Sequence, residues 1–199
     1  MKRDIVTSAI GIVVFTILLG LVYPLAITGI GQVAFPGNAN GQQIHLNGKL
    51  VGSRIIGQSF ASPVIGKNGK PEEKEEALVT EPDPRYFQSR PSATEGGADN
   101  AAASTFSNKG PNSVKTREAD EENIKAYLEL NRPYDPRLTV AKIPVDAVNT
   151  SASGLDPEIS QANAWIQAHR VAALRHLPLA TVNGLISKYT SGRGLGFSG

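Results

Sequence analysis

The sequence of 199 residues contains no cysteine, one tryptophan and three histidines. Without cysteine, the chain cannot form disulfides, thiolate metal sites or a cysteine nucleophile. His45 lies far from the other two histidines, and His169 and His176 are seven residues apart, whereas a helical zinc pair needs a spacing of four. We therefore predict no metal site.

Neither sign of charge dominates, since 20 Lys and Arg stand against 18 Asp and Glu. A nucleic-acid-binding protein needs a concentrated basic surface, so we expect no nucleic-acid partner. No Gly-Lys pair fits the phosphate-binding motif, and Ser151 and Ser153 lie outside any G-x-S-x-G elbow. We therefore predict no catalytic residue and no directly bound cofactor. One alternative stays open, an exported hydrolase that uses Ser153, Asp156 and His169.

Charge is also missing from a long N-terminal stretch, between Asp4 and Lys49. Residues 5–30 within it are mostly apolar and would reach about 39 Å as a helix, enough to cross a hydrocarbon core of about 30 Å. A signal peptide has a shorter apolar region and a small-residue cleavage site. Residues 1–30 are therefore predicted to form a cytoplasmic tip and a transmembrane anchor, with a kink at Pro24.

Lys2 and Arg3 favour a cytoplasmic N-terminus, because basic residues collect on the inner side of a membrane. No second apolar run of spanning length follows. We therefore predict a single-pass protein whose residues 31–199 form one extracytoplasmic domain.

Within that domain, Asn47-Gly48 separates two short apolar segments and predicts a β-hairpin with a type I′ turn. Gly52 is expected to form a bulge, with residues 52–60 extending the second strand. Residues 63–85 are rich in proline and charge, which is typical of a solvated insertion. A further strand is expected within residues 140–148.

Three helices are predicted after the insertion. The first spans residues 117–130 and buries Ile124, Tyr127 and Leu128. The second starts at Asp156 and Pro157 and runs to about His176. The third starts near Pro178. The shared face of the second helix is expected to carry Ala162, Trp165, Ile166, His169 and Ala173. Segregated strands and helices indicate an α+β fold.

A compact cluster of aromatic, basic and proline residues spans residues 86–94, YFQSRPSAT. Aromatic and arginine side chains dominate protein interfaces, so the cluster could be a recognition surface. A buried aromatic pair beside a turn explains the same residues equally well, and both interpretations stay open here.

Five motifs occur in order behind the predicted anchor: GQVAFPGNANGQ (31–42), GSRIIGQSF (52–60), YFQSRPSAT (86–94), SASGLDPEISQANAWIQAHRVA (151–172) and LISKYTSGRGLG (185–196). Together they resemble KdpC, the C-subunit family of Kdp-type potassium-transporting P-type ATPases. The resemblance covers the anchor and nearly all of the following domain.

This resemblance implies a non-catalytic subunit of a high-affinity potassium uptake complex in the bacterial inner membrane. Its partners would be a channel-like potassium-translocating subunit, a P-type ATPase subunit and, in some members, a small single-span subunit. It would assemble and stabilise them, and the family is also described as a catalytic chaperone that raises the ATP affinity of the ATPase subunit. ATP and potassium would be handled by those partners. An independent exported binding domain is the alternative.

The candidate partner-contact residues lie in two of these motifs: Phe35, Pro36, Asn38, Tyr86, Phe87, Arg90, Pro91 and Ser92. The sequence also departs from the family pattern. Residues 63–85 are longer than usual, the segment after RPSA is altered, and the chain ends at Gly199, where the family continues through a last strand and helix. We therefore expect a fold that lacks those two elements.

Overall fold

A computed structural model describes residues 2–74, 77–78, 80–94, 99–106 and 108–192. The chain divides into two compact units, residues 1–55 and 56–199. The helices and strands form a mixed α+β structure, as predicted. The predicted boundary at residues 30 and 31 and the extracytoplasmic placement stay predictions.

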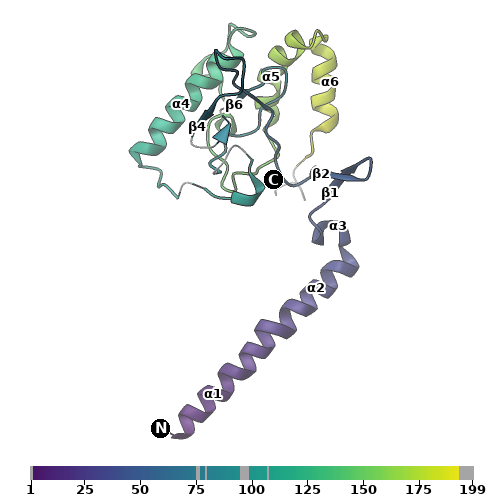
Figure 1. Ribbon diagram of the computed structural model, residues 1–199, viewed down its shortest axis with the longest axis vertical. Helices are drawn as coiled ribbons and strands as arrows, with labels where there is room; N and C mark the ends of the chain where they lie inside the picture. The colour runs from purple at the N-terminus through teal and green to yellow at the C-terminus, as the bar shows by residue number, and fades with distance from the viewer. Residues whose placement is uncertain (1, 75–76, 79, 95–98, 107, 193–199) are drawn as a thin grey trace. The chain divides into compact units, whose positions relative to one another are not determined.

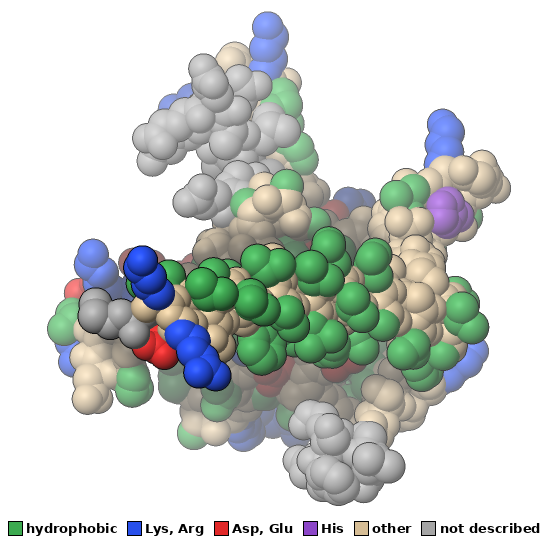
Figure 2. All heavy atoms as spheres, turned by 90° about the horizontal axis from the view of Figure 1, so that it is seen from below, with side chains coloured by type: hydrophobic (Ala, Val, Ile, Leu, Met, Phe, Trp, Pro, Cys, Tyr) green, Lys and Arg blue, Asp and Glu red, His purple; other side chains and the backbone are tan. Residues whose placement is uncertain are grey.

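The first unit begins with one long helix (Figure 1). It runs from Lys2 to Ala34 as α1 (Lys2–Ile17), a π-helical turn η1 (Leu18–Val22) and α2 (Tyr23–Ala34). It is long and apolar enough to cross a membrane, and none of its most apolar window is buried. Apolar side chains cover its visible flank, and Lys and Arg gather at its start (Figure 2).

Pro24 is the second residue of α2, just after the π-helical turn. The long helix shows no sharp kink (Figure 1). A proline ring in a regular helix collides with the carbonyl four residues earlier. The wider π turn gives that ring room. The sequence predicted a disturbance at this proline but not its form.

The predicted hairpin follows the short helix α3 (Pro36–Ala39) and is confirmed. β1 (Gln43–Leu46) pairs antiparallel with β2 (Lys49–Ser53). Asn47 and Gly48 have φ angles of 51° and 77°, as a type I′ turn requires. The register shifts where Ile44 faces Gly52, which confirms the bulge. The expected extension to residue 60 is wrong, because β2 ends at Ser53.

The second unit opens with an antiparallel arm. Its base is β3 (Ala61–Pro63) against β6 (Thr80–Pro82), and β4 (Glu73–Lys74) pairs with β5 (Ala77–Leu78) further out. The described residues of the expected insertion at 63–85 therefore form a paired ribbon more than an irregular loop. Residues 75, 76 and 79 lie outside the described part.

The three predicted helices are α4 (Val114–Asn131), α5 (Gln161–Leu174) and α6 (Leu179–Tyr189). The short turn η2 (Ala101–Ala103) precedes α4, and η3 (Val140–Lys142) and η4 (Val145–Ala147) lie between α4 and α5. The strand expected within residues 140–148 is therefore wrong. Pro144 lacks a donor for sheet pairing and instead precedes η4. α5 begins four residues later than expected, because Ser160 and not Asp156 caps it.

The core consists of two small clusters. Tyr127, Leu138 and Ala147 form one, and Ala168, Ala172 and Val182 form the other. The buried face of α4 was predicted correctly, since Tyr127 is buried there. The expected face of α5 is wrong: Trp165 is 47% exposed, whereas Asn163, Gln167 and Arg170 are fully or almost fully buried. Polar side chains therefore form much of the buried side of α5.

Candidate functional site

The loop that carries the YFQSRPSAT motif is held by the buried side of α5. The Gln88 N–H donates to Gln167 Oε1 at 2.7 Å, and Gln167 Nε2 donates to the Gln88 carbonyl at 3.0 Å. This pair of bonds imitates the pairing of two strands, with one amide side chain in place of the second backbone. It fixes the middle of the loop against the helix.

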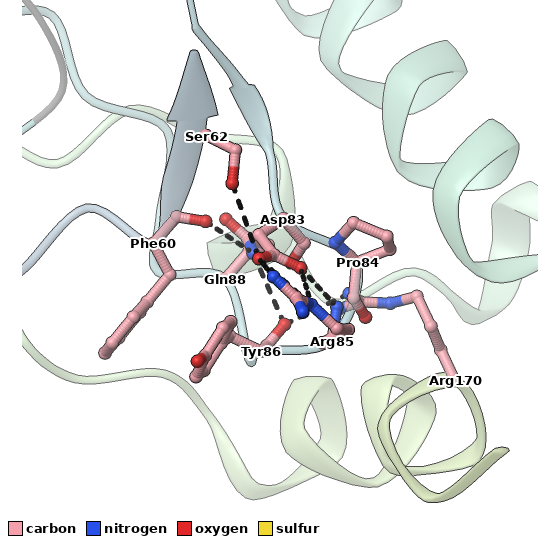
Figure 3. A network of polar contacts seen from close by, with 8 residues as sticks. All are labelled: Phe60, Ser62, Asp83, Pro84, Arg85, Tyr86, Gln88 and Arg170. Atoms are coloured by element: carbon pink, nitrogen blue, oxygen red, sulfur yellow. Dashed lines mark hydrogen bonds and ion pairs between the residues drawn. The ribbon is translucent and has the colours of Figure 1, made fainter. Parts of the chain in front are cut away.

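Arg170 holds the same loop one turn further along α5 (Figure 3). Its Nη1 donates to the carbonyl oxygens of Pro84 at 2.5 Å and Tyr86 at 3.0 Å. Its Nε donates to Asn131 Oδ1 and its Nη2 to Gln167 Oε1, so the guanidinium also joins α5 to α4. We call Arg170, Gln167 and Asn131 the polar clamp.

The guanidinium of Arg170 is fully buried, and no carboxylate among the described residues forms an ion pair with it. Burial lowers the pKa of Arg170 to about 10, which still leaves the side chain charged at neutral pH. Four oxygen acceptors replace its lost water. A neutral side chain could not serve all four acceptors.

Asp83 shapes the start of the loop (Figure 3). Its carboxylate accepts hydrogen bonds from the backbone N–H and guanidinium of Arg85, and from Ser62 Oγ. The bonds from Arg85 hold the pKa of Asp83 well below its usual range. Gln88 Nε2 donates to the Asp83 carbonyl at 2.8 Å, which closes the turn.

The aromatic pair of the motif separates into two environments. Phe87 packs against the cluster of Ala168, Ala172 and Val182. Tyr86 is half-buried and stacks on Phe60, with ring centroids 5.2 Å apart, while the guanidinium of Arg175 lies 5.2 Å from its ring centre. Phe87 therefore belongs to the core, whereas Tyr86 and Phe60 reach the surface. The interpretation of the cluster as a recognition surface stays a prediction.

The second half of the motif is tied to residues 150–156. Arg90 Nη1 donates to Asp156 Oδ2 at 2.9 Å, and Ser92 Oγ donates to the Gly154 carbonyl at 2.8 Å. The Pro91 carbonyl accepts the Ser151 N–H. Gly154 has a φ of 72°, and a Cβ there would lie 2.5 Å from Thr94, so only glycine fits. Asp156 thus pairs with Arg90 and does not cap a helix.

Phe35, Pro36 and Asn38 belong to the first unit. Phe35 ends α2 and is 62% exposed, and Pro36 starts α3. Asn38 is also exposed, and its carbonyl accepts the Gly41 N–H. The role of all eight candidate residues in partner contact stays a prediction.

The residues of the hydrolase alternative are engaged elsewhere. Ser153 Oγ shares a hydrogen bond with Ser151 Oγ, and Asp156 faces Arg90. Within the described part of the chain, neither Ser153 nor Asp156 is hydrogen-bonded to His169. The described part of the chain also holds no group of three or more potential metal ligands.

The described residues of the second unit line a cleft and a groove. A cleft of about 560 Å³ runs between the motif loop and α4, with Arg90, Asp99, Asn123 and Tyr127 among its walls. A larger, more apolar groove of about 880 Å³ lies between α5 and α6, where Val182, Leu185 and Ile186 face it.

Sequence reasoning missed the polar clamp. Two of its members, Gln167 and Arg170, follow the buried Asn163 at spacings of four and three, which places these three residues of α5 on one helix face. This spacing was the available signal, but polar residues at helical spacing usually face water.

Comparison with known proteins agrees with the motif analysis. The family model described as "K+-transporting ATPase, c chain" matches residues 5–199. The potassium-transporting ATPase KdpC subunit of Methylococcus capsulatus is 43% identical over 188 residues, which cover 94% of this chain and 85% of that protein. The KdpC subunit of Koribacter versatilis is 41% identical and covers 100% of this chain and 88% of its own length.

The KdpC subunit of Mycobacterium tuberculosis is 40% identical over 200 residues, covering 100% of this chain and 92% of that protein. These matches span both units, including the long helix and the motif loop. They confirm the resemblance inferred from the five motifs. The chain therefore belongs to the KdpC family, the c chain of K+-transporting ATPases.

Proposed function

We propose that the chain is the accessory subunit of an ATP-driven potassium uptake complex, in which it assembles and stabilises the channel-like subunit and the P-type ATPase subunit. The family match over residues 5–199 carries this proposal. The relatives are named as KdpC subunits of potassium-transporting ATPases.

The long helix supports the same function. None of the apolar window of Lys2–Ala34 is buried within the chain. Such a surface needs lipid or other apolar helices around it, because a helix this apolar is not stable in water. We place it as a single span of the inner membrane, with Lys2 and Arg3 on the cytoplasmic side and the second unit outside.

The motif loop offers a rigid contact surface in this scheme. The polar clamp fixes its backbone, so Tyr86 and Phe60 stay presented at the surface without further ordering on binding. We propose that a partner subunit covers this pair, together with the Phe35 to Asn38 segment of the first unit. Any effect on the ATP affinity of the ATPase subunit would then act through conformational linkage.

Affinity purification of the tagged full chain from gently solubilised membranes tests the proposal. We expect a P-type ATPase and a large multi-span protein to arrive with it, as identified by mass spectrometry. Recovery of the chain alone, monodisperse and stable, would contradict the proposal and favour an independent anchored domain.

A further inference from the structure

The π-helical turn of the long helix changes the hydrogen bonding of the backbone near its middle. In an α-helix the N–H of Tyr23 would donate to Leu19, but here it donates to the Leu18 carbonyl. The donor five residues after Leu19 would be Pro24, which has no N–H. The Leu19 carbonyl therefore loses both its α-helical and its π-helical donor.

The neighbouring carbonyl is affected as well. Gly20 would accept from residue 24 in an α-helix, and that residue is the proline. Two consecutive carbonyls thus lose their regular donors at one place on the helix. A lone proline in a regular helix would remove only one.

This place is open to a neighbour. Leu19 is 58% exposed, and a Cβ added at Gly20 would meet nothing within 4 Å. Leu19 is about 21 Å along the helix from Ile5 and about 17 Å from Ile30, so it lies near the middle of the apolar run. In the membrane placement proposed above, no water reaches that depth, and an unpaired carbonyl there is costly.

We infer that this π turn is a docking site for a transmembrane helix of a partner subunit, which donates a hydrogen bond from a Ser, Thr, Asn or Gln side chain to the Leu19 carbonyl. Gly20 lets that helix approach closely, because it has no side chain in the way. The inference rests on the proposed function, since it needs a partner within the membrane.

Three variants of the full chain test the site, each expressed with its natural partners and purified through a tag on this chain. Pro24→Ala restores the backbone N–H of residue 24, which can donate to the Leu19 carbonyl within the π turn, so that carbonyl has less need of the partner. Gly20→Leu keeps Pro24 but blocks the approach. Gly29→Leu is the matched control, because a Cβ at Gly29 also meets nothing within 4 Å.

We expect Pro24→Ala and Gly20→Leu to insert normally and to lose the partner subunits about threefold to tenfold faster than the wild type, the range typical of single hydrogen bonds between membrane helices. Gly29→Leu should retain them as the wild type does. The Pro24→Ala result separates loss of the docking site from loss of helix stability, because alanine is more favourable than proline in an isolated helix.

Unchanged retention in the Pro24→Ala variant would overturn the inference while leaving the proposed function intact. Equal loss in Gly20→Leu and Gly29→Leu would also overturn it, because the effect would then be general to the helix surface. Absence of partner subunits from the wild-type preparation would overturn the proposed function and this inference together.

Discussion

At the scale of single residues, Arg170 is the side chain on which the motif loop depends most. Replacing it with Met would leave the Pro84 and Tyr86 carbonyls and Asn131 Oδ1 without their donor. We expect Arg170→Met to lower the free energy of unfolding by about 3 kcal/mol.

The fluorescence of Trp165, the sole tryptophan, follows urea unfolding of the full chain in detergent. Arg175→Met, at the C-terminal end of α5, is the control. It removes only the cation over the Tyr86 ring and should lower the free energy of unfolding by less than about 1 kcal/mol. Equal losses of unfolding free energy in the two variants would show that the hydrogen bonds of the polar clamp stabilise the fold no more than the cation over the Tyr86 ring does.

Asp83 gives the second unit a pH dependence in acid. Hydrogen bonds from Arg85 lower its pKa in the folded chain, whereas the unfolded chain titrates near 4. The stabilisation from Asp83 is therefore fully present above about pH 4 and decreases as the pH falls further.

We expect the Tm of the wild type to fall between about pH 5 and pH 2.5. The Tm of the Asp83→Asn variant should be lower than that of the wild type at neutral pH and should change less over this pH range. Parallel Tm profiles, recorded by circular dichroism in acidic buffers, would contradict the role given to this carboxylate.

At the scale of elements, α5 depends on the cap that replaces the expected one. Ser160 Oγ accepts the N–H of Asn163, and Asp146 accepts the Ser160 N–H and a hydrogen bond from the Asn163 side chain. Burial works to raise the pKa of Asp146, but these hydrogen bonds outweigh it and lower that pKa. The carboxylate therefore stays charged beside the N-terminus of α5, where a negative charge is favourable.

We expect Ser160→Ala to destabilise the fold by about 1 kcal/mol, since the first turn loses its side-chain acceptor. Thermal unfolding measures the loss, and Ser160→Asn serves as the control because asparagine also caps helices well. Full stability of the alanine variant would mean that Asp146 alone holds the start of α5.

At the scale of the whole molecule, the arm between β3 and β6 is separate from the elements that hold the motif loop. Among the described residues, residues 64–72 form hydrogen bonds only with one another. Replacing residues 64–79 with a two-residue turn should therefore shift the Tm by less than about 3 °C, which corresponds to roughly 1 kcal/mol for a unit of this size.

Co-purification of the shortened chain with its partners shows whether the arm has a role in assembly. We expect the partners to be retained in full, because the motif loop and the long helix remain unchanged. Loss of the partners at unchanged Tm would instead place a contact on the arm.

Sequence patterns alone were enough to predict the apolar helix, the Asn47-Gly48 hairpin, the buried face of α4 and the family. Each of these depends on neighbouring residues, through hydropathy, turn geometry or helical spacing, or on motifs read in order. The tertiary structure alone decided the polar side of α5. Gln167 and Arg170 are buried because carbonyl oxygens of the motif loop, 79 to 86 residues away in the chain, replace water that these side chains lose. Local sequence patterns predict that such residues face solvent, because the neighbouring residues do not reveal carbonyl acceptors so far away in the chain.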